Sequence, residues 1–444
     1  MNTVWTRITT LVAVALVSLS AQAGLPIQRW TAANHAEVLL IESPALPMVD
    51  VQIDFDAGAR RDPQTQAGLA SAVAAMMSKG VRARDAAPAL DENALGEAWA
   101  DLGALFGASA SSDRFSVTLR SLTVPDVLQG ALQLAARQLA DPTFAAEVWN
   151  TERARFIAAL KEANSQPGTQ AQRAFGRAVY GTHPYGFDPN DASLQAITPA
   201  DLRQFHDRYL NACRARVSIV GALNRVQAEA AVERLLAWLP GGGTCEALPA
   251  VADVQPLGAA VEHKLSLASA QAHVLIGQPG IRRADPAFFP ITVGNYILGG
   301  GGFVSRLTEQ VRERRGLSYS VYSYFAPGLH AGAFTVGLQT RPDQAAQAVQ
   351  VATEVLQRFV QDGPTEQELK AAKDNLVGGF ALRLDSNRKL LDQLANIGWN
   401  RLPLNYLDTW TDEVQRVTVA DIRAAFQRVL QPDRMVTVIV GGQP

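Results

Sequence analysis

Two apolar segments that each end in glycine recur along the chain, and each follows a segment with the polar start of a helix. Val217–Gly221 and Thr437–Gly441 are rich in β-branched residues, which is typical of buried strands. The preceding segments begin at Thr198 and Thr418, and each threonine is followed three residues later by an aspartate. This pattern predicts two N-capped helices, each leading into a strand.

The same segments indicate an internal duplication. Ile197–Arg203 (ITPADLR) matches Val417–Arg423 (VTVADIR), and the two strands repeat at the same spacing, 220 residues apart (217 and 437). Two gapless matches at one spacing indicate two copies of one domain. Each copy is predicted to contain strands, a helix, a hairpin region, a pair of long helices, and then a helix and a final strand. That order is typical of an α+β domain rather than of regular βαβ alternation.

The two copies are separated by a segment with little periodic apolar character. Residues from Pro240 to Pro256 are rich in glycine, alanine and proline, as expected for a linker. We therefore predict an N-terminal domain over residues 24–240, a linker over 241–256 and a C-terminal domain over 257–444.

The first 23 residues have the pattern of a signal peptide. Arg7 precedes an apolar run over Leu11–Leu19, and Ala21–Ala23 (AQA) is a small-x-small cleavage site. A membrane anchor is the alternative, but it needs about 20 apolar residues to span a bilayer, and this run is shorter. We expect export, to the periplasm of a bacterium.

Charge and cysteine content restrict the classes of function. The chain has 40 basic and 42 acidic residues and a formal net charge of -2, so charge gives no reason to expect a nucleic-acid partner. The only two cysteines, Cys213 and Cys245, lack the close spacing of a zinc site. Export would allow them to form a disulfide, but the sequence leaves open whether they approach closely enough.

An alanine-rich segment, Gly68–Gly80, carries the first resemblance to a known family. Together with Tyr180–Gly186 and Asp201–Tyr209, in the same order, it resembles the M16 family of zinc peptidases, and in particular the subfamily that pairs two chains of about this length. The inverted His-x-x-Glu-His motif of that family falls here on three positions that cannot bind zinc: Ser71, Ala74 and Ala75.

The substitutions remove the chemistry that the motif supplies. Two imidazoles four residues apart lie on one helix face and can hold one zinc ion, and the adjacent glutamate can act as general base on the metal-bound water. The resemblance also places the third ligand, a glutamate in the family, at Ala158 or Ala159. We therefore expect this chain to bind no metal, and the remaining histidines show no close pairing at ligand spacing.

The second half carries a different part of the family pattern. Leu298–Leu307 and Val311–Tyr322 resemble the signature of the second domain, in which an arginine and a tyrosine seven positions later face the active site. Here the pair is Arg312 and Tyr319. A guanidinium and a phenol are hydrogen-bond donors suited to substrate carbonyls and to a developing oxyanion. We predict that Gly316 ends the helix of Arg312 and that a strand over Ser318–Tyr324 follows, with Tyr322 and Tyr324 on one face.

A run of four glycines precedes this pair. No Gly-Lys-Ser/Thr follows it, so it is not a phosphate-binding loop. Either the glycines allow close backbone approach near a peptide cleft, or they simply end a helix. The four positions are Gly299, Gly300, Gly301 and Gly302.

The resemblance implies two homologous α+β domains related by pseudo-twofold symmetry, each an antiparallel sheet of about six strands packed with helices. In the two-chain subfamily, one chain carries the zinc motif and the other carries the arginine–tyrosine pair. We therefore expect a non-catalytic, peptide-binding subunit, inactive alone, whose partner is a homologous exported chain with an intact motif that binds the zinc. A homodimer in isolation is compatible with the sequence. The alternative is a structural or peptide-binding protein without proteolysis.

Overall fold

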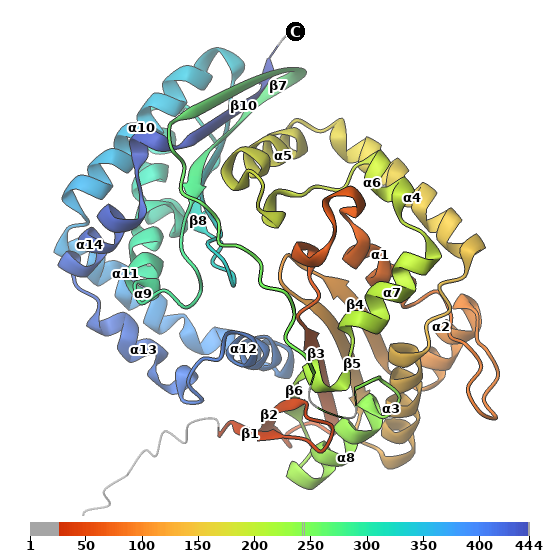
Figure 1. Cartoon of the computed structure of the whole chain (residues 1–444). Coiled ribbons are helices and arrows are strands. Elements are labelled where there is room, and N and C mark those ends of the chain that lie inside the picture. Colours follow the sequence, from red (N-terminus) through yellow and green to blue (C-terminus); the bar gives the residue numbers. More distant parts are fainter. Residues whose placement is uncertain (1–25, 242, 244, 443–444) are drawn as a thin grey trace, which may run out of the picture.

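The computed structural model describes residues 26–241, 243 and 245–442, which form two halves that face each other (Figure 1). The predicted signal peptide, residues 1–23, lies outside the described residues. Within them, no helix combines the length and the apolar character that crossing a membrane requires.

The N-terminal half contains a six-stranded sheet with the order β1-β2-β6-β3-β5-β4. Neighbouring strands are antiparallel, except that β2 and β6 are parallel. The strands are β1 (Gln28–Thr31), β2 (Glu37–Glu42), β3 (Met48–Phe55), β4 (Leu105–Ala110), β5 (Phe115–Leu122) and β6 (Arg216–Gly221). The helices are α1 (Leu69–Met76), α2 (Glu92–Asp101), α3 (Pro125–Ala140), α4 (Ala146–Asn164), α5 (Pro167–Tyr180), α6 (Asp191–Ala196), α7 (Pro199–Tyr209) and α8 (Arg225–Leu236).

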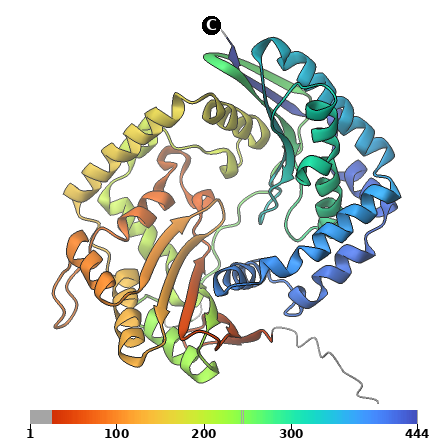
Figure 2. The same ribbon diagram turned by 180° about the vertical axis from the view of Figure 1, so that it is seen from behind.

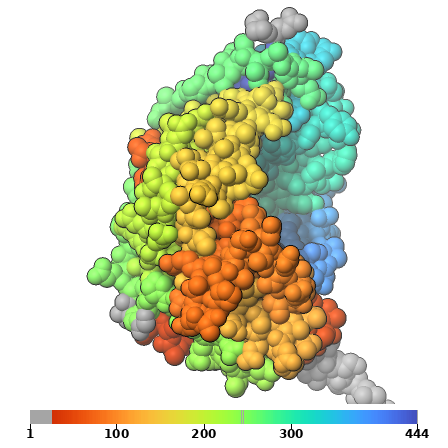
Figure 3. Space-filling model, turned by 90° about the vertical axis from the view of Figure 1, so that its right-hand side faces the viewer, coloured from red at the N-terminus to blue at the C-terminus, as the bar shows by residue number. Residues whose placement is uncertain are grey.

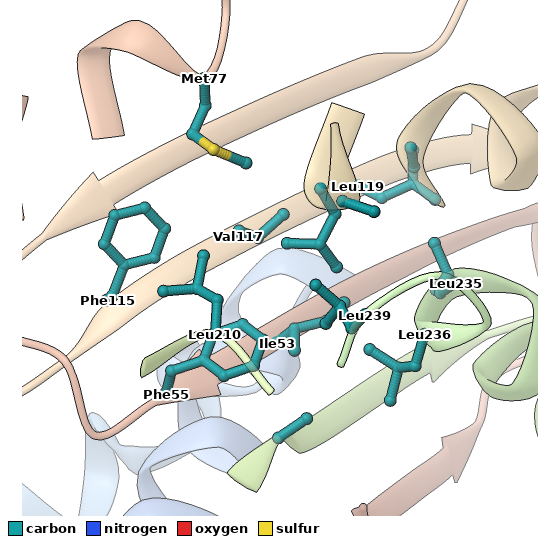
Figure 4. Close-up of a cluster of buried hydrophobic side chains, with 14 of the residues drawn as sticks. Ile53, Phe55, Met77, Phe115, Val117, Leu119, Leu210, Leu235, Leu236 and Leu239 are labelled. Carbon is teal, nitrogen blue, oxygen red and sulfur yellow. The ribbon is translucent and has the colours of Figure 1, made fainter. Parts of the chain in front are cut away.

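One face of this sheet forms the main core of the N-terminal half. Alternate residues of β5 are buried, as expected for a strand with one covered face. Phe55, Phe115 and Val117 pack there with Met77 and with leucines that follow α7 and α8 (Figure 4).

The C-terminal half is built on a sheet with the order β10-β7-β9-β8. The strands are β7 (Val261–Pro279), β8 (Val321–Phe325), β9 (Ala333–Thr340) and β10 (Val436–Gly442). The helices are α9 (Phe288–Asn295), α10 (Ala345–Asp362), α11 (Glu366–Gly378), α12 (Asn387–Asn400), α13 (Tyr406–Arg416) and α14 (Val419–Val429), together with two π-helical segments, η5 (Tyr296–Gly300) and η7 (Thr308–Glu313).

The long strand β7 contributes two arms to this sheet. Val436 of β10 pairs with both Val261 and Gly277 of β7. The outer arm, residues 261–268, therefore runs parallel to β10 on one side. The inner arm, residues 271–279, is antiparallel to β10 and to β9 on the other side. The predicted α+β class is confirmed. In each half one pair of strands is parallel rather than antiparallel, and among the described residues the C-terminal sheet has four strands rather than about six.

The duplication extends well beyond the two segments that reveal it in the sequence. Five pairs of elements begin 220 residues apart: α3 and α10, α4 and α11, α5 and α12, α7 and α14, and β6 and β10. Thr198 and Thr418 cap α7 and α14, and each forms a reciprocal capping box with the aspartate three residues later. The predicted helix starts are therefore confirmed.

Each half places one helix on the sheet of the other half (Figures 1 and 2). Helix α5 packs on β7 and β10 through Phe175, whose ring lies against Gly277, where a Cβ would be 2.8 Å from it. Helix α12 packs on β2 and β6, and Gly398 brings it close to Leu39. Because α5 and α12 are equivalent helices, this exchange follows the pseudo-twofold relation. It buries apolar side chains from both halves together.

A disulfide ties the segment between the halves to the N-terminal half. Cys213, in the turn before β6, is bonded to Cys245, with 5.8 Å between their Cα atoms. The sequence alone had left open whether these two cysteines form a disulfide. Between α8 and β7 the described residues form no helix or strand.

Candidate functional site

Arg312 is held by apolar packing on one side of its helix and by aromatic rings on the other. It lies in η7, which is anchored by the fully buried Leu307 and Val311. Its guanidinium carbon is 4.6 Å from the ring centroids of both Phe303 and Tyr319, and its Nε is 3.2 Å from a carboxylate oxygen of Glu313. Cation–π contacts of this kind hold an arginine in place while its terminal nitrogens remain free to donate.

Tyr319 lies in the turn that leads from η7 into β8. Gly316 ends the helical segment with φ +60°, as predicted, but the strand begins at Val321 rather than at Ser318. The Ser318 hydroxyl donates to the carbonyl of Gln339 in β9 at 2.7 Å and to that of Ser320 at 2.6 Å, which fixes the turn. Tyr319 is 81% exposed. The structure thus brings the predicted pair into contact on an open surface.

Two further apolar side chains are exposed beside this pair, Phe303 at 70% and Val304 at 73%. Phe303 completes the aromatic contacts of Arg312, and its sequence pattern did not predict this role. A phenylalanine after a glycine run has no distinguishing pattern, so only the fold reveals its role. With Tyr319 they form an exposed group of apolar side chains around the charged Arg312.

The four glycines lie where η5 ends against β8. Gly299 is buried, and a Cβ there would be 2.5 Å from the backbone nitrogen of Ser323. Gly302 has φ +62° and begins the turn that presents Phe303. Close backbone approach and helix termination are therefore both features of this run: Gly299 lies against β8, and η5 ends at Gly300 with Gly301 as its C-cap. A direct role of the glycines in peptide binding stays a prediction.

A cavity of about 510 Å³ opens between the two halves next to this turn. The N-terminal half contributes the first two turns of α5, and the C-terminal half contributes β7, β9 and the start of β8. Its lining includes Gln166, Gly168, Arg173, His273, Ser320, Tyr322 and Gln339. Burial lowers the pKa of His273, and burial raises the pKa of Tyr322. Both groups are therefore uncharged at neutral pH, and Arg173 supplies the positive charge of the lining.

The helix that resembles the zinc-binding helix of the family is α1. Ser71 is exposed, Ala74 is buried and Ala75 is half-buried. Asp62 caps its start by accepting hydrogen bonds from the backbone N–H groups of Gly68 and Ala70, at 2.9 and 3.0 Å. The helix is thus well formed, but at the three motif positions it carries the hydroxyl of Ser71 and the methyl groups of Ala74 and Ala75.

One acidic side chain near α1 was missed by the sequence analysis. Glu152 of α4 lies 3.2 Å from the amino group of Lys79, which follows α1 and also bonds Glu92 at 2.6 Å. The expected third-ligand positions, Ala158 and Ala159, lie about two turns further along α4 and are exposed. Glu152 and Lys79 are 73 residues apart in sequence, and no local pattern links them. The Glu152 carboxylate is therefore paired with the Lys79 ammonium group and not with other potential metal ligands.

These residues do not fit a zinc ion. A catalytic zinc needs about three protein ligands, and Ser71, Ala74 and Ala75 supply no imidazole or carboxylate. Across residues 26–241, 243 and 245–442, no three or more His, Cys, Asp or Glu side chains are grouped so that they could hold a metal.

Two histidines that are distant in sequence do come together. His183 and His330 have ring centroids 5.0 Å apart, across the contact between the halves. His330 Nδ1 lies 3.0 Å from Asp253, and His183 packs on Tyr185. These side chains act in packing and in hydrogen bonding at the domain contact, where Asp113 also accepts from Tyr185 at 2.6 Å and from the backbone of Leu329 at 2.9 Å.

The fold and the site together define a class: a two-domain chain with the architecture of a zinc peptidase, but without the side chains that would hold zinc. Comparison with known proteins agrees. The sequence profile described as "Insulinase (Peptidase family M16)" matches residues 37–187, and that described as "Peptidase M16 inactive domain" matches residues 196–376.

Individual relatives span nearly the whole chain. A crystal structure of a peptidase M16 inactive domain from Pseudomonas fluorescens superimposes with a TM-score of 0.88 at 34% identity, covering 95% of this chain and 98% of that one. An uncharacterized zinc protease of Mycobacterium leprae is 26% identical over 90% of this chain and 89% of its own length. A non-peptidase homolog from Helicobacter pylori is 26% identical over 88% of each. The chain belongs to peptidase family M16.

Proposed function

We propose that the chain is the non-catalytic, substrate-binding subunit of a heterodimeric, exported zinc peptidase. Arg312 and Tyr319 hold the peptide, and a homologous exported partner with an intact His-x-x-Glu-His motif holds the zinc. The observation that carries the proposal is the contrast between the two halves. The N-terminal half has lost every zinc-binding side chain at Ser71, Ala74 and Ala75, whereas the C-terminal half keeps a preorganised, exposed Arg312–Tyr319 pair.

The surroundings of the pair suit an extended peptide. Strand β8 lies at the edge of its sheet, so a peptide strand can add to it through main-chain hydrogen bonds. Tyr322 and Tyr324 stack on that strand with 6.0 Å between ring centroids and are 39% and 37% exposed. The adjacent cavity has room for a side chain of the bound peptide.

Export is supported by the disulfide, because disulfides persist in oxidising compartments.

The test is reconstitution with an M16 chain from the same host that carries the intact motif. We expect the mixture to cleave an unfolded peptide. Arg312→Ala should lower kcat/KM by about 100-fold, because a charged donor to the substrate is lost. Tyr319→Phe keeps the ring over Arg312 and removes only the hydroxyl, so a loss of about tenfold is expected. Arg315→Ala is the matched control, since Arg315 is an exposed arginine in the same segment. Equal activity of all four proteins would refute the assignment.

A second candidate, a peptide-binding protein without proteolysis, is favoured by the name of the Helicobacter pylori relative, a non-peptidase homolog. The same variants separate the two candidates. If no mixture cleaves peptide but Arg312→Ala still weakens peptide binding, this second function is the correct one.

A further inference from the structure

The outer arm of β7 is an exposed sheet edge whose counterpart in the other half is covered. In the N-terminal half, β2 runs parallel to β6, and β1 pairs antiparallel with the other edge of β2, with Trp30 opposite Val38. In the C-terminal half, the outer arm runs parallel to β10 in the same way. Val261 pairs with Val436, just as Glu37 pairs with Arg216 in the N-terminal half. Arg216 and Val436 are equivalent positions, 220 residues apart. Among the described residues, no strand pairs with the outer side of this arm.

The backbone of the outer arm is ready to form a further ladder. The Val261 N–H donates to the carbonyl of Met435 at 3.2 Å, so the backbone groups of Val261 point toward the β10 side. Because N–H and C=O groups alternate in direction along a strand, those of Glu262, Lys264 and Ser266 face outward. An unpaired edge of this kind binds other strands unless it is covered.

The side chains on this edge are complementary to themselves. When a strand pairs antiparallel with an identical strand around His263, Glu262 of each copy lies opposite Lys264 of the other, and Val261 lies opposite Leu265. Glu262 and Lys264 are exposed and in contact with each other in the single chain. Val261 and Leu265 are 38% and 40% exposed, so part of each aliphatic side chain is available for contact with a second copy.

The registers centred one residue to either side of His263 are disfavoured by charge. The two copies form main-chain hydrogen bonds only when outward-facing residues lie opposite each other. Because these residues are two positions apart, the centre of the twofold arrangement always falls on a residue. A centre at Glu262 places two carboxylates opposite each other, and a centre at Lys264 does the same with two ammonium groups. Of the three centres that place the charged residues of the two copies opposite each other, only His263 pairs opposite charges, and this arrangement has the twofold symmetry that a closed dimer requires.

We propose that the outer arm of β7 is a self-association edge, on which a second copy of this chain adds antiparallel, centred on His263. The two C-terminal sheets then become one continuous sheet. Since the interface is one strand wide, the dimer is weak, with a Kd of about the micromolar range. This inference does not rest on the proposed function, because it needs neither a peptide nor a zinc-binding partner.

Analytical ultracentrifugation of the purified chain tests the proposal. We expect a monomer–dimer equilibrium, weakened about tenfold or more in Lys264→Glu, because both charge pairs become repulsive. The double variant Glu262→Lys/Lys264→Glu restores complementarity and should dimerise like the wild type. Lys370→Glu, which changes an exposed lysine on α11, is the matched control and should leave the equilibrium unchanged. Thermal melts of each variant verify that it is folded.

Three results would overturn the proposal. The wild-type chain could remain a monomer at the highest soluble concentration. Lys264→Glu could dimerise as well as the wild type. The double variant could fail to regain what the single variant loses. None of these results would bear on peptide cleavage by the mixed complex.

Discussion

Arg312 illustrates how single residues are positioned on this surface. Its guanidinium lies 4.6 Å from two aromatic rings that are themselves largely exposed. The rings restrict its orientation without using its hydrogen-bond donors.

Glu368 gives a prediction at this scale that concerns stability. Its carboxylate accepts two hydrogen bonds from Arg306, at 2.6 and 2.7 Å, and caps α11 with Thr365. Burial raises the pKa of Glu368, but the hydrogen bonds from Arg306 and Thr365 outweigh it and bring the pKa from 4.5 to about 2. Because the folded-state pKa is lowered, this stabilisation is complete above pH 4.5 and is lost as pH falls toward 2.

We therefore expect Glu368→Gln to lower the free energy of unfolding by about 1 kcal/mol at pH 7. The difference from the wild type should shrink between pH 4.5 and 2, since protonated glutamate resembles glutamine. Urea unfolding at several pH values measures it. A difference that stays constant with pH would show that the ion pair contributes nothing.

At the scale of elements, the exchange of α5 and α12 between the halves joins them. Leu390, Leu391 and Leu394 of α12 pack against Leu39, Ile41 and Val220 of the N-terminal sheet. This cluster belongs to neither half alone. Its loss would weaken the contact between the halves as well as the helix.

We expect Leu394→Ala, at a fully buried position, to destabilise the protein by about 3 kcal/mol. Leu382→Ala is the control, because Leu382 is 67% exposed in the segment before α12 and should change stability by less than about 0.5 kcal/mol. Thermal unfolding compares the two. Equal melting temperatures would contradict the packing described for α12.

Local signals made some of these elements predictable from the sequence. Thr198 and Thr418 cap helices through contacts three residues away, so their pattern survives in a short window. The contact of Arg312 with Tyr319 spans only seven residues and was also predicted, through the family resemblance. By contrast, the packing of Phe175 on Gly277, the pairing of Glu152 with Lys79 and the two-armed strand β7 depend on segments far apart in the chain. No sequence window contains both partners of such contacts.

At the scale of the whole molecule, the two halves form one body with the C-terminal half set behind the N-terminal half in the side view (Figure 3). Asp113 accepts a hydrogen bond from the backbone N–H of Leu329, and the Tyr185 hydroxyl accepts one from the backbone N–H of His330, across the contact between the halves; the disulfide fixes the connecting segment. The cavity next to Tyr322 is lined by both halves. Its shape therefore depends on how firmly they are held together.

The disulfide gives a prediction at this scale. It closes a loop of 32 residues, so its removal should cost about 3–4 kcal/mol by the chain-entropy estimate. We expect a reducing agent to lower the melting temperature of the wild type and to leave Cys245→Ala unchanged. A wild-type melting temperature that is indifferent to reduction would show that the bond contributes no stability.

The central claim is a division of labour, in which this chain holds the peptide and a related chain performs the cleavage. The most direct measurement is the rate of peptide cleavage, with zinc supplied, by this chain alone, by the motif-bearing partner alone and by their equimolar mixture. The account predicts no cleavage by this chain, little by the partner and rapid cleavage by the mixture. Cleavage by this chain alone at the rate of the mixture would contradict it.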